Sequence, residues 1–188
     1  MNGEKRYMKL IIGAGRTRYD GWVATQEDEL NVLAYRDWKK FCDEESLDAI
    51  LAEHVWEHMT FEEGVIAAKN VYEFLKPGGY IRCAVPDGNF NNEWYQNMVK
   101  IGGLGPEDHP AYTHKIMYDY KKFIKVFKEA GFKVELLEYC DDDGRFHYRY
   151  WNAEDGYIGR SYRYDSRNND KEIKMVSIII DAYKEIKI

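Results

Sequence analysis

Short apolar runs separated by polar segments recur along the chain, and four of them have the length of buried strands. These runs are Met8 to Ile12, Leu47 to Ala52, Tyr80 to Val85 and Met175 to Ala182. Continuous apolar runs bounded by turn residues are typical of strands buried on both faces. Two weaker candidates, residues 22–25 and residues 132–139, complete the set of expected strands.

Helical spacing of apolar residues follows two of the polar turns. Thr60 and Glu63 have the spacing of a capping box, and Pro77-Gly78-Gly79 is expected to end the helix that begins there. A second apolar helix face falls within residues 123–130. The order strand, helix, strand over residues 47–85 predicts a βαβ unit. We expect the last two strands of the chain to pair antiparallel.

Two stretches depart from a regular α/β pattern. Only residues 13–21 separate the first two strand candidates, whereas a parallel crossover usually needs a dozen residues or more. The first crossover is therefore expected to be shortened or non-helical. Residues 89–118 have no steady period, and we interpret them as a lid on the substrate side. A chain of 188 residues is expected to form a single domain over residues 1–188.

Composition narrows the classes of partner. The net charge of −6 argues against unspecific binding to nucleic acid, whose phosphates require a basic face. No run approaches the roughly 18 apolar residues of a membrane span. The three widely spaced cysteines predict reduced thiols and hence a cytoplasmic protein. Neither nucleic acid nor a membrane is therefore an expected partner, and the oligomeric state is left open.

Two local motifs carry candidate chemistry. Gly13-Ala14-Gly15 directly follows the first apolar run, and such a turn lets backbone amides approach a ligand closely. Residues 54–58 match the H-x-x-E-H pattern of inverted zinc peptidases, in which His54 and His58 would bind zinc and Glu57 would act as the base. That alternative requires the motif to lie inside a helix and a third ligand farther along the chain.

The same motifs resemble a different family. Glu53 to Met59 after a strand, followed by Lys76-Pro77-Gly78-Gly79 and another strand, is similar to the fourth-strand region of class I S-adenosylmethionine (SAM)-dependent methyltransferases of the type 11 group. Residues 10–15 followed by residues 20–23 resemble the compact variant of that family, which lacks the long first helix. The resemblance covers roughly residues 8–140.

This resemblance implies a Rossmann-like class I methyltransferase fold, an α/β architecture with a mostly parallel sheet, an antiparallel C-terminal strand pair and a shortened first crossover. It implies SAM as the cofactor, no metal ion, and methyl transfer to an oxygen or nitrogen atom of a small-molecule acceptor. The cofactor contacts that it implies are the methionine part at Gly13, Ala14 and Gly15, the ribose at Gln26 or Glu27, the adenine at Asp37 and Trp38, and the sulfonium beside Glu53.

Several roles stay open at the level of sequence. Gln26 stands where the family has an acidic residue, so the ribose contact lacks charge assistance unless Glu27 provides it. Trp38 fits either stacking on the purine or packing in the core. The candidate bases are His54, His109 and His114, because histidine titrates near neutral pH.

Two further alternatives concern the tail and the activity itself. Arg160, Arg163 and Arg167, with Asp165, suit either an anionic substrate or a solvated, self-paired loop. The substitution at position 26 and the missing helix also fit a non-catalytic member of the fold that acts as a binding or scaffold protein.

Overall fold

The computed structural model describes residues 8–103, 110–169 and 172–186. In these residues the strands are β1 (Lys9–Ile12), β2 (Trp22–Ala24), β3 (Leu47–Glu53), β4 (Leu75–Pro86), β5 (Lys133–Cys140), β6 (Phe146–Tyr148) and β7 (Ser177–Tyr183). The α-helices are α1 (Tyr35–Phe41), α2 (Phe61–Phe74), α3 (Glu93–Val99) and α4 (Tyr120–Glu129). Three short 3₁₀ turns are η1 (Trp56–His58), η2 (Pro110–Thr113) and η3 (Ala153–Asp155).

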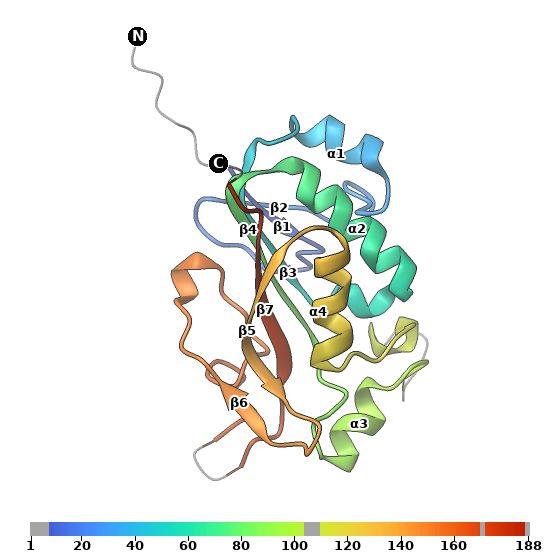
Figure 1. Ribbon diagram of the computed structural model, residues 1–188. Coiled ribbons are helices and arrows are strands. Elements are labelled where there is room, and N and C mark those ends of the chain that lie inside the picture. Colours follow the sequence, from blue (N-terminus) through green and yellow to red (C-terminus); the bar gives the residue numbers. More distant parts are fainter. Residues whose placement is uncertain (1–7, 104–109, 170–171, 187–188) are drawn as a thin grey trace.

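The described strands form one seven-stranded sheet in the order β2-β1-β3-β4-β7-β5-β6 (Figure 1). The pairs β1–β2, β1–β3 and β3–β4 are parallel. Strand β7 lies between β4 and β5 and is antiparallel to both, so β5 points in the same direction as β4. The mostly parallel sheet and the antiparallel pairing of the last two expected strands are confirmed.

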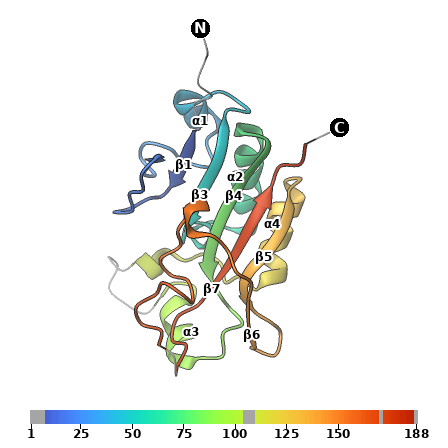
Figure 2. The same ribbon diagram turned by 90° about the vertical axis from the view of Figure 1, so that its left-hand side faces the viewer.

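Both faces of the sheet are covered, but by different kinds of structure. Helices α2 and α4 lie on one face, and an irregular segment between β6 and β7 crosses the other face (Figures 1 and 2). Successive residues of β3 point to opposite faces of the sheet. Ile50 packs in the core on the helical side, whereas Leu51 packs with Trp151 and Ile158 of the irregular segment. Two covered faces explain why the strands are continuously apolar.

Helix α2 begins at the expected capping box. The Thr60 hydroxyl accepts a hydrogen bond from the Glu63 amide at 3.2 Å, and the Glu63 carboxylate accepts one from the Thr60 amide at 2.8 Å. The helix ends at Phe74, and Pro77-Gly78-Gly79 lies inside β4 instead of forming a break between helix and strand. The residue before a proline avoids the helical region, which favours an extended chain already at Lys76.

The first crossover is short and contains no helix, as expected. Residues 13–21 form turns, and the backbone returns to the sheet through a hydrogen bond from the Ala14 amide to the Thr25 carbonyl at 2.9 Å. Cys42, Cys83 and Cys140 are free thiols. In the part of the chain that the structure describes, every helix falls short of the length or the hydropathy needed to cross a bilayer.

Candidate functional site

Two adjoining cavities lie at the carboxyl ends of β1 and β3. The first has a volume of about 360 Å³ and the second a volume of about 480 Å³. Both are lined by Ile12, Gly13, Gly15 and His54, so the glycine turn and the exit of β3 stand between them. Ligands of open α/β sheets bind at this edge.

The glycine turn is held in a conformation that excludes side chains. Gly13 and Gly15 have φ values of 57° and 53°, in the left-handed region that favours glycine. A Cβ atom at Gly13 would lie 2.8 Å from a methyl carbon of Val55. Ala14 between them is buried and lines only the second cavity. The turn therefore brings bare backbone to the boundary of both cavities.

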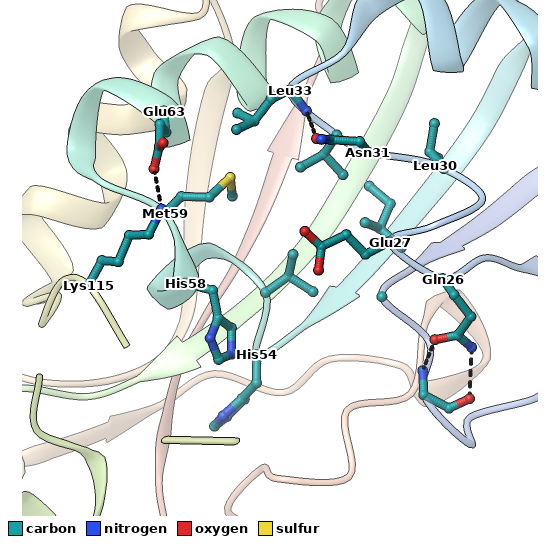
Figure 3. A pocket seen from close by; sticks show the side chains of 15 residues that line it. Gln26, Glu27, Leu30, Asn31, Leu33, His54, His58, Met59, Glu63 and Lys115 are labelled. Carbon is teal, nitrogen blue, oxygen red and sulfur yellow. Dashed lines mark hydrogen bonds and ion pairs between the residues drawn. The ribbon is translucent and has the colours of Figure 1, made fainter. Parts of the chain in front are cut away.

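Gln26 and Glu27, at the exit of β2, have different roles. The Gln26 side chain forms two hydrogen bonds with Gly15, accepting from the amide at 3.2 Å and donating to the carbonyl at 2.9 Å. Glu27 points into the first cavity (Figure 3), and its carboxylate has no hydrogen bond or ion pair with other described residues. Gln26 thus supports the turn, and Glu27 is the acidic group offered to a ligand.

The expected adenine contacts at Asp37 and Trp38 do not fit the structure. Trp38 is fully buried, donates its indole N–H to the Val32 carbonyl at 3.1 Å and stacks on Phe74. Asp37 forms an ion pair of 2.7 Å with Lys40, whose hydrogen bond lowers the pKa of the Asp37 carboxyl. Neither residue lines either of the two cavities. Helix α1 instead supports the loop of residues 30–33, which does line the first cavity.

Glu53, the last residue of β3, lines the second cavity. Its carboxylate oxygens accept hydrogen bonds from the amides of Gly159 at 3.2 Å and Arg160 at 2.7 Å. Arg160 also lines this cavity, whereas Arg167 forms a 2.6 Å ion pair with Asp165, as the self-paired alternative requires. Glu53 therefore anchors the irregular segment at the edge of the second cavity.

His54 is the candidate base that the structure brings to both cavities. Its φ of 56° is unusual for a residue with a side chain. Its Nε2 lies 3.0 Å from the Ser177 hydroxyl oxygen, and its Nδ1 lies 3.2 Å from Glu57 Oε1. Ser177 in turn donates to the Arg160 carbonyl at 2.8 Å. His54, at the end of β3, is thus linked through Ser177 to Arg160 of the irregular segment.

His114, the other candidate base among the described residues, lines neither cavity. His114 is buried, its Nδ1 lies 2.8 Å from the Val99 carbonyl, and burial lowers the pKa of its imidazole. His109 lies outside the described residues. Burial acts to raise the pKa of Glu57, beside His114, but the imidazoles of His54 and His58 and the backbone amide of Glu57 together outweigh this effect, so the pKa lies below its ordinary value.

The zinc-peptidase alternative is wrong. It requires His54 and His58 on one face of an α-helix, but the motif starts at the end of β3, passes through the left-handed His54 and ends in the 3₁₀ turn η1. The two histidines consequently do not share a helix face. Glu57, the supposed base, is only 1% exposed.

Two further residues of the first cavity were not among the expected cofactor contacts or candidate bases. One is His58, which the sequence had suggested only as a zinc ligand in the peptidase alternative. The other is Lys115, which forms a 3.1 Å ion pair with Glu63 (Figure 3). Lys115 belongs to residues 89–118, whose role as a lid on the substrate side stays a prediction.

The chain was also compared with known proteins. No protein-family model matches it, and no curated protein is similar to it in sequence. A SAM-dependent methyltransferase from Methanosarcina mazei superposes with a TM-score of 0.56 at 13% identity, over 98% of this chain and 95% of that one. The fold is that of SAM-dependent methyltransferases. A SAM-dependent methyltransferase from Archaeoglobus fulgidus gives a TM-score of 0.54 at 15% identity, over 94% and 85% of the two chains.

Proposed function

We propose that the protein transfers a methyl group from SAM to an oxygen or nitrogen atom of a small-molecule acceptor. The observation on which this rests is the first cavity, where a glycine turn after β1 and the free carboxylate of Glu27 after β2 meet at the carboxyl edge of the sheet. The fold supports the proposal because proteins with the same architecture are SAM-dependent methyltransferases.

In this proposal the first cavity holds the cofactor, and the second cavity receives the acceptor. Glu27 would hold the ribose hydroxyls in the first cavity, where a carboxylate gives charge-assisted hydrogen bonds. Gly13 and Gly15 would border the methionine part, and Glu53 would lie on the side of the sulfonium. A carboxylate near the cationic sulfonium is electrostatically favourable. The acceptor then enters the second cavity, beside Arg160 and His54.

Positioning provides most of the expected rate enhancement in this proposal. Methyl transfer is an in-line displacement, so the protein has to hold the methyl carbon and the acceptor atom in line and exclude water. His54, at the boundary of both cavities, is the described candidate base nearest to such an acceptor. SAM itself supplies the activated methyl group when it is bound.

The first test is calorimetric titration with S-adenosylhomocysteine, the product form of the cofactor. We expect micromolar binding by the unaltered protein and at least about tenfold weaker binding by Glu27→Gln, because a charge-assisted hydrogen bond is worth about 1.5–3 kcal/mol. Asp28→Asn is the matched control, since Asp28 is an exposed neighbour that lines neither cavity.

The outcomes separate the proposal from the scaffold alternative. No binding at millimolar S-adenosylhomocysteine overturns the proposal and leaves a binding or scaffold protein with this fold. Binding that Glu27→Gln and Asp28→Asn weaken equally contradicts the assignment of the ribose contact to Glu27. Binding without turnover of any oxygen or nitrogen acceptor in a radiolabelled-SAM screen favours a non-catalytic member.

A further inference from the structure

Glu57 is a buried carboxylate with no hydrogen-bond donor. It lies in η1, and neither of its oxygens accepts a hydrogen bond from the described residues. Its neighbours are imidazole rings: His54 Nδ1 at 3.2 Å and His114 Nε2 at 3.9 Å from Oε1. A buried carboxylate is retained in proteins when it is paired with a cation or binds a metal ion.

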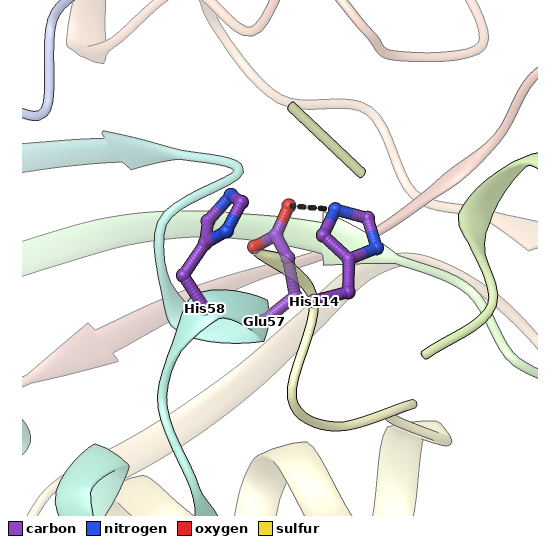
Figure 4. A group of neighbouring side chains, drawn as sticks. All are labelled: Glu57, His58 and His114. Carbon is purple, nitrogen blue, oxygen red and sulfur yellow. Dashed lines mark ion pairs between the residues drawn. The ribbon is translucent and has the colours of Figure 1, made fainter. Parts of the chain in front are cut away.

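Hydrogen bonding fixes the proton of His114 on the side away from Glu57. Its Nδ1 lies 2.8 Å from the Val99 carbonyl oxygen, and because a carbonyl can only accept, Nδ1 carries the proton. In the neutral ring, Nε2 is then an unprotonated acceptor directed at Glu57 (Figure 4). Two acceptors facing each other in a buried place are satisfied only by a proton or a metal cation between them.

His58 is held in a similar way. Its Nδ1 lies 2.8 Å from the Thr113 hydroxyl oxygen, and that hydroxyl is within 3.0 Å of the Pro110 carbonyl. Both hydrogen bonds form together only if Thr113 donates to the carbonyl and His58 Nδ1 donates to Thr113. A neutral His58 therefore also keeps one unprotonated nitrogen. Outer hydrogen bonds of this kind orient the histidine ligands of metal sites.

We propose that Glu57, His58 and His114 bind a divalent transition-metal ion, with zinc as the expected metal. One ligand atom from each residue lies within 4.8 Å of the others (Figure 4). Ligands of a tetrahedral zinc ion with bond lengths of about 2.0–2.1 Å lie roughly 3.4 Å apart, so binding requires an inward movement on the order of 1 Å. Two imidazoles and one carboxylate are a common zinc ligand set.

The site joins segments that are distant in the sequence. Glu57 and His58 come from the turn after β3, and His114 comes from the segment between η2 and α4. Because His58 also lines the first cavity, the metal ion lies beside it and bridges the two segments. This proposal does not depend on methyl transfer, and its ligands differ from the expected cofactor contacts.

The test uses the full-length protein after treatment with EDTA, titrated with ZnCl₂ by calorimetry and with Co²⁺ by visible absorption. We expect one equivalent of zinc per chain and the absorption of a tetrahedral Co²⁺ site. The ligand variants are His58→Ala, His114→Ala and Glu57→Gln. The matched control is His147→Ala, since His147 contacts the Asp141 carboxylate at 2.7 Å in an exposed hairpin.

Each ligand variant is expected to bind zinc at least about 100-fold more weakly, because loss of an outer hydrogen-bond partner alone costs 10–100-fold in affinity. The control should bind as the unaltered protein does. Less than half an equivalent of zinc in the unaltered protein, or equal affinity in His58→Ala, overturns the proposal and leaves a proton shared between Glu57 and His54. Circular dichroism verifies folding, and partly exposed His58 keeps the test decisive if a buried variant unfolds.

Discussion

At the scale of single residues, His54 combines an unusual backbone conformation with a place in the candidate site. Its side chain lines both cavities, yet its φ of 56° is a conformation that costs roughly 1–2 kcal/mol for a residue with a Cβ atom. Its amide is bonded to the Ala84 carbonyl of the neighbouring strand β4 at 2.8 Å, which holds the backbone in place. Strained residues of this kind cluster at functional sites, where the contacts of the surrounding structure hold them in place.

Comparing two substitutions at this position isolates the strain from the loss of the imidazole. Both His54→Gly and His54→Ala remove the ring contacts, but only glycine adopts a positive φ without cost. Glycine has more freedom in the unfolded chain, which offsets part of this advantage. We still expect the free energy of unfolding of His54→Gly, measured in urea, to exceed that of His54→Ala by about 1 kcal/mol.

The same pair of substitutions at Lys69 is the control. Lys69 is exposed in the middle of α2, where glycine should be less stable than alanine by about 1 kcal/mol. Equal stabilities of the two His54 variants would show that the left-handed conformation stores no strain there.

Residues of the candidate site differ in how far the sequence predicted them. Gly13 and Gly15 were predictable because a glycine turn after a buried strand is determined by neighbouring residues. Trp38 was not, because its burial depends on Phe74, which is 36 positions away in the sequence. The same holds for Lys115, which reaches the first cavity through the path of a segment without a regular pattern.

At the scale of elements, segments with a clear apolar pattern were predictable, whereas several short elements were not. Strands β3 and β7 and helix α2 lie where the apolar patterns place them, with ends that differ by a few residues. Strand β6, with three residues, is too short to display a period, and α1 and α3, with seven residues each, span only about two turns. These short elements need tertiary contacts to exist, and such contacts leave little trace in a local pattern.

The capping box of α2 gives an element-scale prediction. Thr60→Ala removes the acceptor for the Glu63 amide and should lower the free energy of unfolding by about 1 kcal/mol, measured in urea. Thr60→Ser keeps the hydroxyl and should retain most of that stability. If the serine and alanine variants are equally destabilised, the hydroxyl does not cap the helix.

At the scale of the whole molecule, one buried arginine joins the two halves of the sheet to the irregular segment. Arg82 of β4 forms a two-pronged ion pair with Asp181 of β7, with N–O distances of 2.8 and 2.7 Å. It also donates to the carbonyls of Asn152 at 2.7 Å and Gly156 at 2.8 Å. The parallel half of the sheet, the antiparallel half and the covering segment are therefore fixed to a single guanidinium group.

This arrangement predicts a strong asymmetry between breaking the buried pair and replacing it. Arg82→Ala leaves Asp181 buried without its cation and should cost about 3–5 kcal/mol of unfolding free energy in a urea titration. Arg82→Met combined with Asp181→Leu removes both charges at similar volume and should recover part of that loss. Arg149→Ala, which breaks the more exposed pair with Glu135, should change stability by less than about 1 kcal/mol. A double variant no more stable than Arg82→Ala would mean that the bonds to Asn152 and Gly156, and not the ion pair, make Arg82 indispensable.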